Sequence, residues 1–153
     1  MDLSTLLHPD CTRCAVEVTS KKKALELLGQ LAAPRLSNTT AFDVFESLLQ
    51  RERLGSTGIG FGIAIPHGRV ADASKPVALL ITLAEAIDFD AIDNQPVDII
   101  FALLVPESQH EQHLHTLAAV AQRLNDKQTT RAMRDASSDM ELYQAFIPCN
   151  SSS

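Results

Sequence analysis

One histidine in this sequence, His67, lies between a proline and a glycine, in a setting that suits chemistry. Pro66 restricts the backbone before the ring and lacks an amide donor, whereas Gly68 leaves space beside it. A neutral imidazole has one free ring nitrogen, so it serves as a nucleophile, a base or a metal ligand. Arg51 and Arg69 flank this stretch, and a guanidinium group forms paired hydrogen bonds with an oxyanion. These residue types favour a nucleophilic histidine that attacks phosphorus.

The stretch from residue 51 to residue 69 also contains five of the six glycines of the chain. Glycine allows a phosphate group to come close to the backbone, and the hydroxyls of Ser56 and Thr57 add donors. We therefore expect Ser56, Thr57 and Gly68 to contribute to phosphate binding. A dinucleotide-binding pattern that starts at Gly58 would need glycine at position 63, where the chain has isoleucine, and no Gly-Lys-Ser/Thr sequence is present. The glycines therefore do not predict a nucleotide-binding loop.

Several segments of the chain resemble the phosphotransferase-system IIA proteins of the fructose/mannitol type. The glycine-rich stretch is similar to the phosphorylation-site motif of that family, and the other segments are similar to its nitrogen-related branch. Phe61 departs from the pattern, since the resemblance leads us to expect a small polar residue such as asparagine there. The similar segments are residues 20–26, 51–60, 62–68, 89–98, 101–106 and 113–117.

The resemblance implies a phosphoryl carrier with a regulatory function. It implies that His67 accepts a phosphoryl group from the histidine of a small phosphocarrier protein. Arg51 would clamp the phosphate, although an arginine near a helix C-terminus also complements the helix dipole. His113 would orient His67 or its phosphoryl group. The phosphorylation state would control partners such as potassium-transport regulators or sensor kinases.

A second hypothesis is sugar transport, in which the chain passes the phosphoryl group to the cysteine of a fructose-type IIB component. The sequence contains no fused IIB domain and no membrane segment, so we expect regulation instead. In both cases we expect a carrier component of a phosphotransferase system rather than a free-standing turnover enzyme.

Charge and composition argue against several other functions. The formal net charge is −6 and the sequence pI is about 5.2, whereas general binding to nucleic acids or anionic membranes needs a positive field. No apolar run approaches the roughly 20 residues of a membrane span, and the N-terminus lacks the pattern of an export signal. We therefore expect a cytoplasmic protein. The oligomeric state is not predicted.

Two patterns bear on metal or redox chemistry, and neither is complete. Cys11 and Cys14 form a C-x-x-C sequence, but a redox motif of this kind follows a strand and opens a helix, and a zinc site needs further ligands. We interpret this segment as a loop with two thiols. His110 and His113 share one helical face, but the H-E-x-x-H arrangement is missing. We expect no metal and no other cofactor, with His110 and His115 at the surface.

Periodic apolar residues predict the helices that position the site. An amphipathic helix is expected over residues 20–33, and we interpret the basic residues 21–23 at its start as a solvated turn rather than a docking patch for an acidic partner. A second helix is expected to begin at Asn38 and end at Gly55, which places Arg51 in its last turn. The expected buried residues are Ala24, Leu27, Leu28, Leu31, Phe42, Phe45, Leu48 and Leu49.

Strands are expected at residues 57–59, 62–65, 77–83 and 97–105. The first two surround a turn at Gly60, with His67 just past the second. The last two are short apolar runs that predict strands covered on both faces. Between them, Asp88-Phe89-Asp90 resembles the D-x-D motif of haloacid-dehalogenase phosphatases, but we interpret it as a solvated turn because the further residues of that site are missing.

The C-terminal third is expected to be helical. Ser108 and Glu111 form a capping box that predicts a helix start, and shorter helices are expected at residues 127–136 and after Ser138. Together these elements predict a single three-layer α/β/α domain over residues 1–148, followed by a disordered tail at residues 149–153. The resemblance adds a mixed sheet with both histidines at one edge. The expected contacts of the C-terminal helices are Leu114, Leu117, Ala118, Ala121, Leu124, Leu142, Tyr143 and Phe146.

Overall fold

A mixed six-stranded sheet forms the centre of the structure. The computed structural model describes residues 3–71, 75–109 and 113–147. Its strands are β1 (Leu7–Val16), β2 (Gly58–Gly60), β3 (Ile63–Ala64), β4 (His67–Val70), β5 (Val77–Ile87) and β6 (Val97–Pro106). They lie in the order β1-β5-β6-β3-β2, and β4 pairs with the second half of β6. The β1–β5, β3–β6 and β4–β6 pairs are parallel, whereas β2–β3 and β5–β6 are antiparallel.

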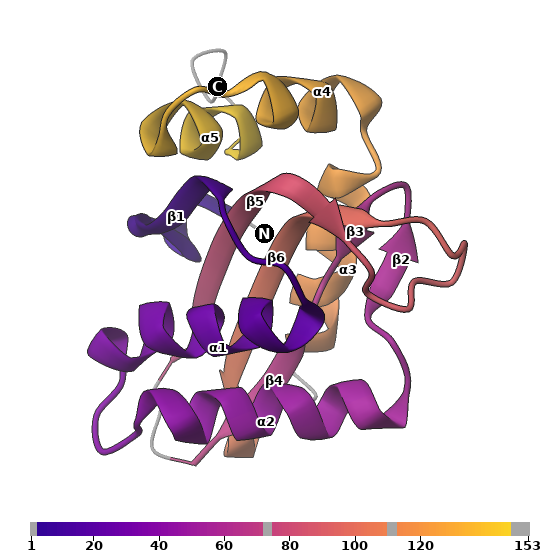
Figure 1. Ribbon diagram of the computed structural model, residues 1–153. Helices are drawn as coiled ribbons and strands as arrows, with labels where there is room; N and C mark the ends of the chain where they lie inside the picture. The colour runs from indigo at the N-terminus through magenta and orange to yellow at the C-terminus, as the bar shows by residue number, and fades with distance from the viewer. Residues whose placement is uncertain (1–2, 72–74, 110–112, 148–153) are drawn as a thin grey trace.

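Helices cover both faces of this sheet. They are α1 (Lys21–Ala32), α2 (Ala41–Leu54), α3 (Leu114–Leu124), α4 (Lys127–Asp135) and α5 (Asp139–Phe146), with short 3-10 helices at Leu3–Thr5, Ala33–Arg35 and Glu107–Gln109. Figure 1 shows α1 and α2 on one side of the sheet and α4 and α5 on the other, while α3 runs beside the edge that contains β3 and β4. The predicted three-layer α/β/α architecture with a mixed sheet is confirmed. Within the described residues, no helix combines the length and the apolar character that a membrane crossing requires.

The two long central strands carry the core. Leu79, Leu80 and Ile81 are consecutive residues of β5, and all three are fully buried. Because successive side chains of a strand point to opposite faces, burial of all three means that both faces are covered. Ile99 and Ile100 on β6 show the same pattern. This confirms the prediction made from the two apolar runs. In the connection between the strands, Asp88 and Asp90 are exposed as expected, although Phe89 is fully buried.

The start of α2 differs from the prediction. Thr40, not Asn38, caps the helix: its hydroxyl accepts from the Asp43 amide at 3.1 Å, and the Asp43 carboxylate accepts from the Thr40 amide at 3.0 Å. This reciprocal capping box satisfies two amide donors, whereas Asn38 has a left-handed backbone with φ of 54° in the preceding connection. The buried face of the helix also differs in part from our expectation. Phe42, expected in the core, is 64% exposed, and Val44 is buried instead.

The start of α3 was also predicted wrongly. Ser108 lies in the 3-10 helix Glu107–Gln109, and α3 itself begins at Leu114 with His113 at its N-cap position. Glu111, the second member of the expected capping box, lies outside the described residues. Leu114 is exposed, and Thr116, Val120 and Leu124 form the buried stripe. Helical spacing was compatible with both the predicted and the observed stripe. The observed stripe includes a polar residue, Thr116, so a search for apolar residues did not identify it.

The segment with Cys11 and Cys14 is strand β1 and not a loop. Its pairing with β5 contains two irregularities, which break the alternation of buried and exposed residues on which strand prediction rests. Cys11 is buried, and burial raises the pKa of its thiol. Cys14 is half-buried; its thiol contacts the Ala136 carbonyl at 3.2 Å and its amide donates to Asp139 at 2.7 Å. Both cysteines therefore lie in packed structure.

Helix α4 and helix α5 agree with the prediction. The Ser138 hydroxyl caps α5 by accepting from the Glu141 amide at 3.1 Å. Leu142 and Phe146 are buried and Tyr143 is half-buried. The expected disordered tail at residues 149–153 lies outside the described residues, as does Pro148.

Candidate active site

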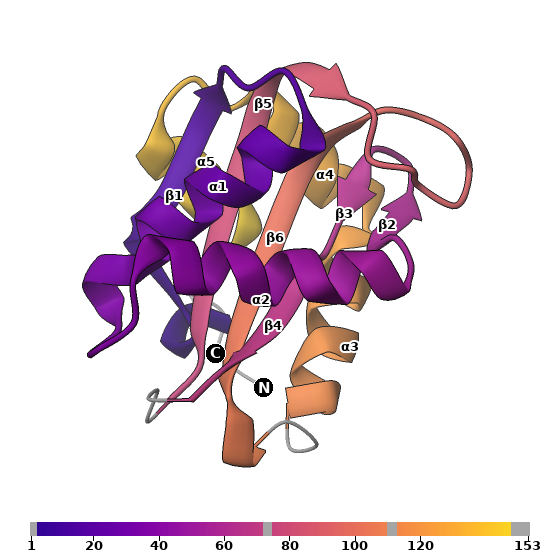
Figure 2. The ribbon, with the colours of Figure 1, turned by 60° about the horizontal axis from the view of Figure 1, so that its bottom comes forward.

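His67 lies just past strand β3, as expected, and is the first residue of strand β4, which was not predicted. It pairs with Leu103 of β6, whose amide donates to the Pro66 carbonyl at 3.0 Å. Helix α2 crosses β4 (Figure 2), and the contact is so close that a Cβ on Gly68 would overlap with the Ser47 hydroxyl. Proline, strand pairing and helix packing therefore fix the backbone on both sides of the histidine.

Two hydrogen bonds orient the half-buried imidazole of His67. Its Nδ1 lies 3.1 Å from the Ile65 carbonyl oxygen, and its Nε2 lies 3.2 Å from Nε of Arg51. Because the carbonyl can only accept and the guanidinium can only donate, the contacts assign the proton to Nδ1 and the lone pair to Nε2. The same guanidinium donates through Nη1 to the Gly55 carbonyl at 2.8 Å. The predicted proximity of Arg51 and His67 is thus present.

The site opens into a hollow of about 670 Å³ between α2, β4 and the start of α3. His67 and Gly68 line it together with the cations Arg51 and Arg69. The lining acids are Asp43, Glu46 and Glu107. The hollow therefore combines a nucleophilic ring nitrogen with cations beside it and acidic groups around it.

Ser56 and Thr57, which we predicted to bind phosphate, form bonds that support the loop. Ser56 donates its hydroxyl to the Phe89 carbonyl at 2.8 Å and accepts from the Gly58 amide at 3.0 Å. The Thr57 hydroxyl contacts the Glu52 carboxylate, which also accepts from the Thr57 amide at 3.2 Å. Both hydroxyl protons are thus engaged within the protein. Direct binding of phosphate by these two residues stays a prediction.

The sequence analysis missed a buried carboxylate next to Arg51. Only 2% of the Glu52 side chain is exposed, and its carboxylate lies 2.7 Å from Nζ of Lys21. Lys21 was interpreted as part of a solvated turn, but its ammonium also lies 4.9 Å from the centre of the Phe89 ring. One signal was available, because Glu52 falls four residues after Leu48 and eight after Val44, on the buried stripe of α2.

His113 lies at the N-cap position of α3, beside the hollow. Its Nε2 is 3.3 Å from the Gln109 side-chain oxygen, and its Nδ1 is 3.4 Å from the Thr116 hydroxyl. The next residue, Leu114, lines the hollow that contains His67. The role of His113 toward His67 stays a prediction. His115 is exposed, as expected, whereas His110 lies outside the described residues.

Metal ligands do not gather in the part of the chain that the structure describes. Over residues 3–71, 75–109 and 113–147, no group of three or more His, Cys, Asp or Glu side chains is arranged to hold a metal ion.

Comparison with known proteins decides the family. A family model described as the phosphoenolpyruvate-dependent sugar phosphotransferase system, EIIA 2, matches residues 5–147. The chain belongs to this EIIA type 2 family. A relative from Klebsiella oxytoca named nitrogen regulatory protein is 51% identical over 152 residues, which cover 99% of this chain and 93% of the relative. The protein of the same name from Escherichia coli K12 is 54% identical over 145 residues, which cover 94% and 88%.

A solved structure from the same EIIA family supports the fold in detail. The crystal structure of the nitrogen regulatory protein IIA-Ntr from Neisseria meningitidis superposes with a TM-score of 0.86 at 38% identity. The match covers 93% of this chain and 97% of the other. The resemblance inferred from the motifs, including the assignment to the nitrogen-related branch, is therefore confirmed.

Proposed function

We propose that this EIIA protein is a regulatory phosphoryl carrier and that Nε2 of His67 accepts the phosphoryl group. The observation that supports the proposal best is the pair of contacts on the ring. The bond between Nδ1 and the Ile65 carbonyl holds the ring in the tautomer that has its lone pair on Nε2. That nitrogen faces Arg51 at 3.2 Å.

The proposed step is an exchange between two imidazoles. The Nε2 lone pair of His67 forms a bond to phosphorus, while the bond between phosphorus and the donor's histidine nitrogen breaks and its electron pair returns to the donor ring. Phosphoryl transfer of this kind depends mainly on alignment and on stabilisation of charge on the phosphoryl oxygens. The Ile65 carbonyl supplies alignment, and Arg51 and Arg69 supply positive charge.

The proposed donor is a small histidine-containing phosphocarrier protein. The three acids that line the hollow, Asp43, Glu46 and Glu107, favour a donor whose docking surface is basic, because complementary charges speed encounter and reject wrong partners. Membership of a family that belongs to the phosphoenolpyruvate-dependent sugar phosphotransferase system supports a donor of this class.

Phosphorylation would convert the site into a switch. It adds roughly two negative charges at a rim that already contains acids, so any partner that contacts this rim would meet a different surface. The name of the relatives, nitrogen regulatory protein, supports a regulatory role. We propose regulatory targets of the kind that the sequence analysis named, potassium-transport regulators or sensor kinases.

The direct test is phosphorylation with purified upstream components and phosphoenolpyruvate, followed by mass mapping. We expect the wild type to gain one phosphate that is labile in acid and stable in alkali, and we expect His67→Ala to gain none. His115→Ala is the matched control, because His115 is an exposed histidine on α3, and it should be phosphorylated like the wild type. An unmodified wild type, or a modified His67→Ala variant, would contradict the proposal.

The assignment of His113 has its own test. We expect His113→Ala to slow phosphorylation by up to about 100-fold, because a misplaced reacting group costs rate, while the final amount of phosphate on His67 stays the same. Transfer reactions that are quenched at short times measure the rate of phosphorylation. An unchanged rate would remove His113 from the site.

A further incubation separates regulation from sugar transport. Phosphorylated protein is mixed with a fructose-type IIB domain, and the phosphate on each protein is followed over time. We expect the phosphate to stay on His67. Rapid stoichiometric transfer to the IIB cysteine would identify a transport component instead.

A further inference from the structure

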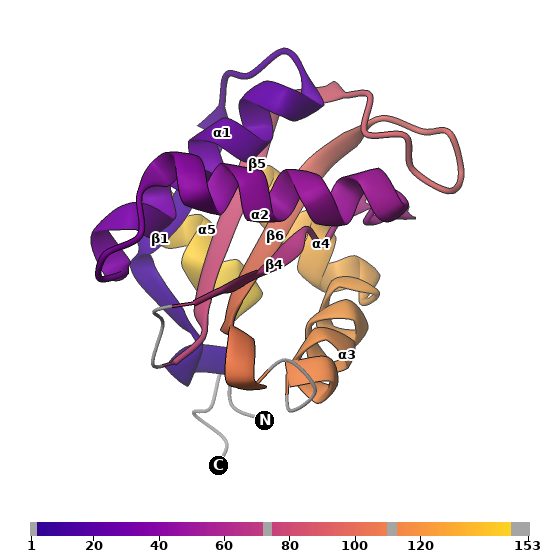
Figure 3. The same cartoon turned by 90° about the horizontal axis from the view of Figure 1, so that it is seen from below.

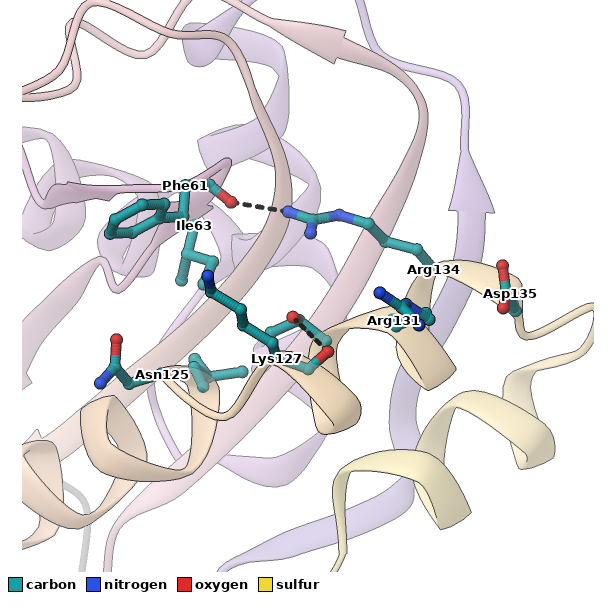
Figure 4. Close-up of a pocket in the computed structure, with 9 residues that line it drawn as sticks. Phe61, Ile63, Asn125, Lys127, Arg131, Arg134 and Asp135 are labelled. Carbon is teal, nitrogen blue, oxygen red and sulfur yellow. Dashed lines mark hydrogen bonds between the residues drawn. The ribbon is translucent and has the colours of Figure 1, made fainter.

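A second cavity, separate from the His67 hollow, lies between the β2–β3 hairpin and the α3–α4 junction (Figure 4). Its volume is about 480 Å³, which lies within the range of roughly 300 to 1,000 Å³ that is typical of small-molecule sites. Phe61 and Ile63 line it from the hairpin, and Leu124 and Asn125 line it from the end of α3. The cavity thus has an apolar wall to which two distant segments contribute.

Phe61 has a backbone conformation that is unfavourable for its residue type. Phe61 and Gly62 form the hairpin turn with φ of 59° and 80°, and such turns favour asparagine followed by glycine. A bulky residue in this region is an outlier. The Asp93 carboxylate accepts from the Phe61 amide at 3.0 Å, and Arg134 donates to the Phe61 carbonyl at 2.7 Å. These bonds hold Phe61, a residue that is 74% exposed, beside the cavity. Residues with an unfavourable backbone conformation cluster at functional sites.

The opposite wall of the cavity is basic. Lys127, Arg131 and Arg134 line it from α4, in a chain with a net charge of −6. Arg134 is bound to the Asp98 carboxylate at 2.9 to 3.1 Å. The side chains of Lys127 and Arg131 make no ion pair with any described residue. Figure 4 shows the Lys127 amine directed toward Phe61 and Ile63, while the one lining acid, Asp135, lies at the far end.

We propose that this cavity binds a small anion with a flat apolar body, a class that includes nucleotides and aromatic carboxylates. The flat body would lie against the Phe61 ring, because aromatic rings stack on bases and similar groups. The anionic group would bind Lys127 and Arg131, whose charges have no acidic partner among the described residues. This ligand site is additional to the proposed phosphoryl transfer at His67. It also gives Phe61, the departure from the family pattern, a function.

The test measures the binding of three probes by isothermal titration calorimetry: adenosine monophosphate, indole-3-acetate and inorganic phosphate. We expect at least one of the two aromatic anions to bind more tightly than inorganic phosphate. Preference for adenosine monophosphate would identify a nucleotide site, and preference for indole-3-acetate would identify an aromatic carboxylate site. Failure of both aromatic anions to bind at millimolar concentrations, or equal binding of inorganic phosphate, would overturn the proposal.

Two variants locate the ligand. Phe61→Asn should weaken the preferred probe by roughly 5-fold to 150-fold, the loss expected for removal of one stacking ring. Because asparagine suits the turn, this variant should keep or raise the melting temperature, so weaker binding cannot result from unfolding. Lys127→Gln/Arg131→Gln should weaken binding and flatten its dependence on salt. Normal affinity in either variant would overturn the site.

Two controls separate this proposal from the function proposed for His67. Lys22→Gln/Lys23→Gln removes two charges from the exposed start of α1 and should leave the affinity unchanged. His67→Ala should bind the probe like the wild type. Loss of binding in His67→Ala would assign the probe to the phosphoryl-transfer hollow and overturn the second site, whereas failure of phosphorylation alone would leave it standing.

Discussion

The segment 61–68 uses glycine for different physical reasons at its two ends. At the His67 end, Gly68 lies in a strand and allows α2 to pack so closely that a Cβ would overlap with Ser47. At the hairpin end, Gly62 has φ of 80°, which glycine adopts readily. The first end needs a residue without a side chain. The second needs a residue that adopts positive φ readily, and a Cβ there would also meet the ends of the Arg134 and Asp98 side chains. Figure 3 shows the close packing of α2 over β4 from below.

The difference separates what each end can do. Around His67, the bonds from Ile65 and Arg51 already orient the ring, as expected of a group that must react in one geometry. Around Phe61, the backbone is fixed but Lys127 and Arg131 have no acidic partner among the described residues. These arrangements agree with the two proposals, a reaction at one end and capture of a ligand at the other. Substitutions at the two ends should have different consequences.

The largest expected effect comes from the ion pair that precedes the segment. Lys21→Met removes the cation from the buried carboxylate of Glu52, which holds the Thr57 amide and hydroxyl. Removal of one partner from a buried pair is strongly destabilising, and because Lys21 is partly exposed we expect a loss of about 3 kcal/mol. Phosphorylation of His67 should also slow, since Arg51 is adjacent to Glu52. Urea unfolding and transfer rates measure the two effects.

The double variant Lys21→Met/Glu52→Gln sharpens this prediction. It removes the uncompensated charge and keeps an oxygen that accepts from Thr57, so it should recover a large part of the lost stability. If the double variant is less stable than Lys21→Met alone, the carboxylate stabilises the loop without help from Lys21, and our account of the pair is wrong.

The next effect separates the two ends directly. Gly68→Ala should cost roughly 2 kcal/mol because it overpacks the contact with Ser47, and the shift of β4 should slow phosphorylation of His67. Gly62→Ala should cost about 1–2 kcal/mol because of its left-handed backbone. Its Cβ must also displace the ends of the Arg134 and Asp98 side chains, but the phosphorylation rate should stay unchanged. Thermal unfolding and transfer rates of both variants measure the contrast.

A compensating substitution serves as the control. Ser47→Gly removes the side-chain atoms that a methyl group on residue 68 would meet and leaves only a backbone atom of residue 47 nearby, so it should restore part of the stability and rate of Gly68→Ala. It should not restore the stability of Gly62→Ala. Equal rescue of both variants would show that the two ends are not distinct in the way we describe.

The elements that were predicted best are those whose burial follows a regular spacing of apolar residues. The apolar runs of β5 and β6 and the periodicity of α4 and α5 identified these elements because burial on both faces, or on one helical face, leaves a regular signal. Strand β1 left none, since its pairing with β5 is irregular. Thr40 and Asp43 displaced Asn38 as the cap of α2 because two reciprocal bonds outweigh one. The spacing of residues in the sequence does not show which of two possible capping residues the folded helix uses.

The candidate site shows the same difference between what local patterns report and what tertiary contacts determine. The proximity of His67 and Arg51 could be predicted because proline, glycine and a helix end lie close to them in the sequence, whereas the proposed role of Arg51 depended on the family resemblance. The pair of Lys21 and Glu52 joins residues 31 positions apart, and no local pattern reports it. The hydroxyls of Ser56 and Thr57 were reasonable phosphate donors by type, but the fold provides them with partners at Phe89 and Glu52. Residue type therefore predicts what a group can do, and tertiary contacts decide whether it remains available.

The smallest expected effect concerns pH at the hairpin end. Hydrogen bonds from the Phe61 amide and then the Gln95 amide lower the pKa of Asp93 from its ordinary value of 3.8. A carboxylate with a lowered pKa stabilises the folded state fully above the ordinary value, and this contribution is lost as the pH falls through the lower, folded value. We therefore expect the Phe61 amide resonance to shift, and the protection of this amide against hydrogen exchange to fall relative to its intrinsic exchange rate, only below about pH 4.

The same titration tests whether the two ends are independent. The resonances of the His67 backbone should not follow the titration of Asp93, because the ring of His67 is held by Ile65 and Arg51 and not by the hairpin turn. Asp93→Asn provides the reference, since it removes the titrating group and keeps an acceptor for the Phe61 amide. A transition of the Phe61 amide centred above pH 3.8, or one that persists in Asp93→Asn, would show that another group controls the turn. The unfavourable backbone conformation of Phe61 would then need a different explanation.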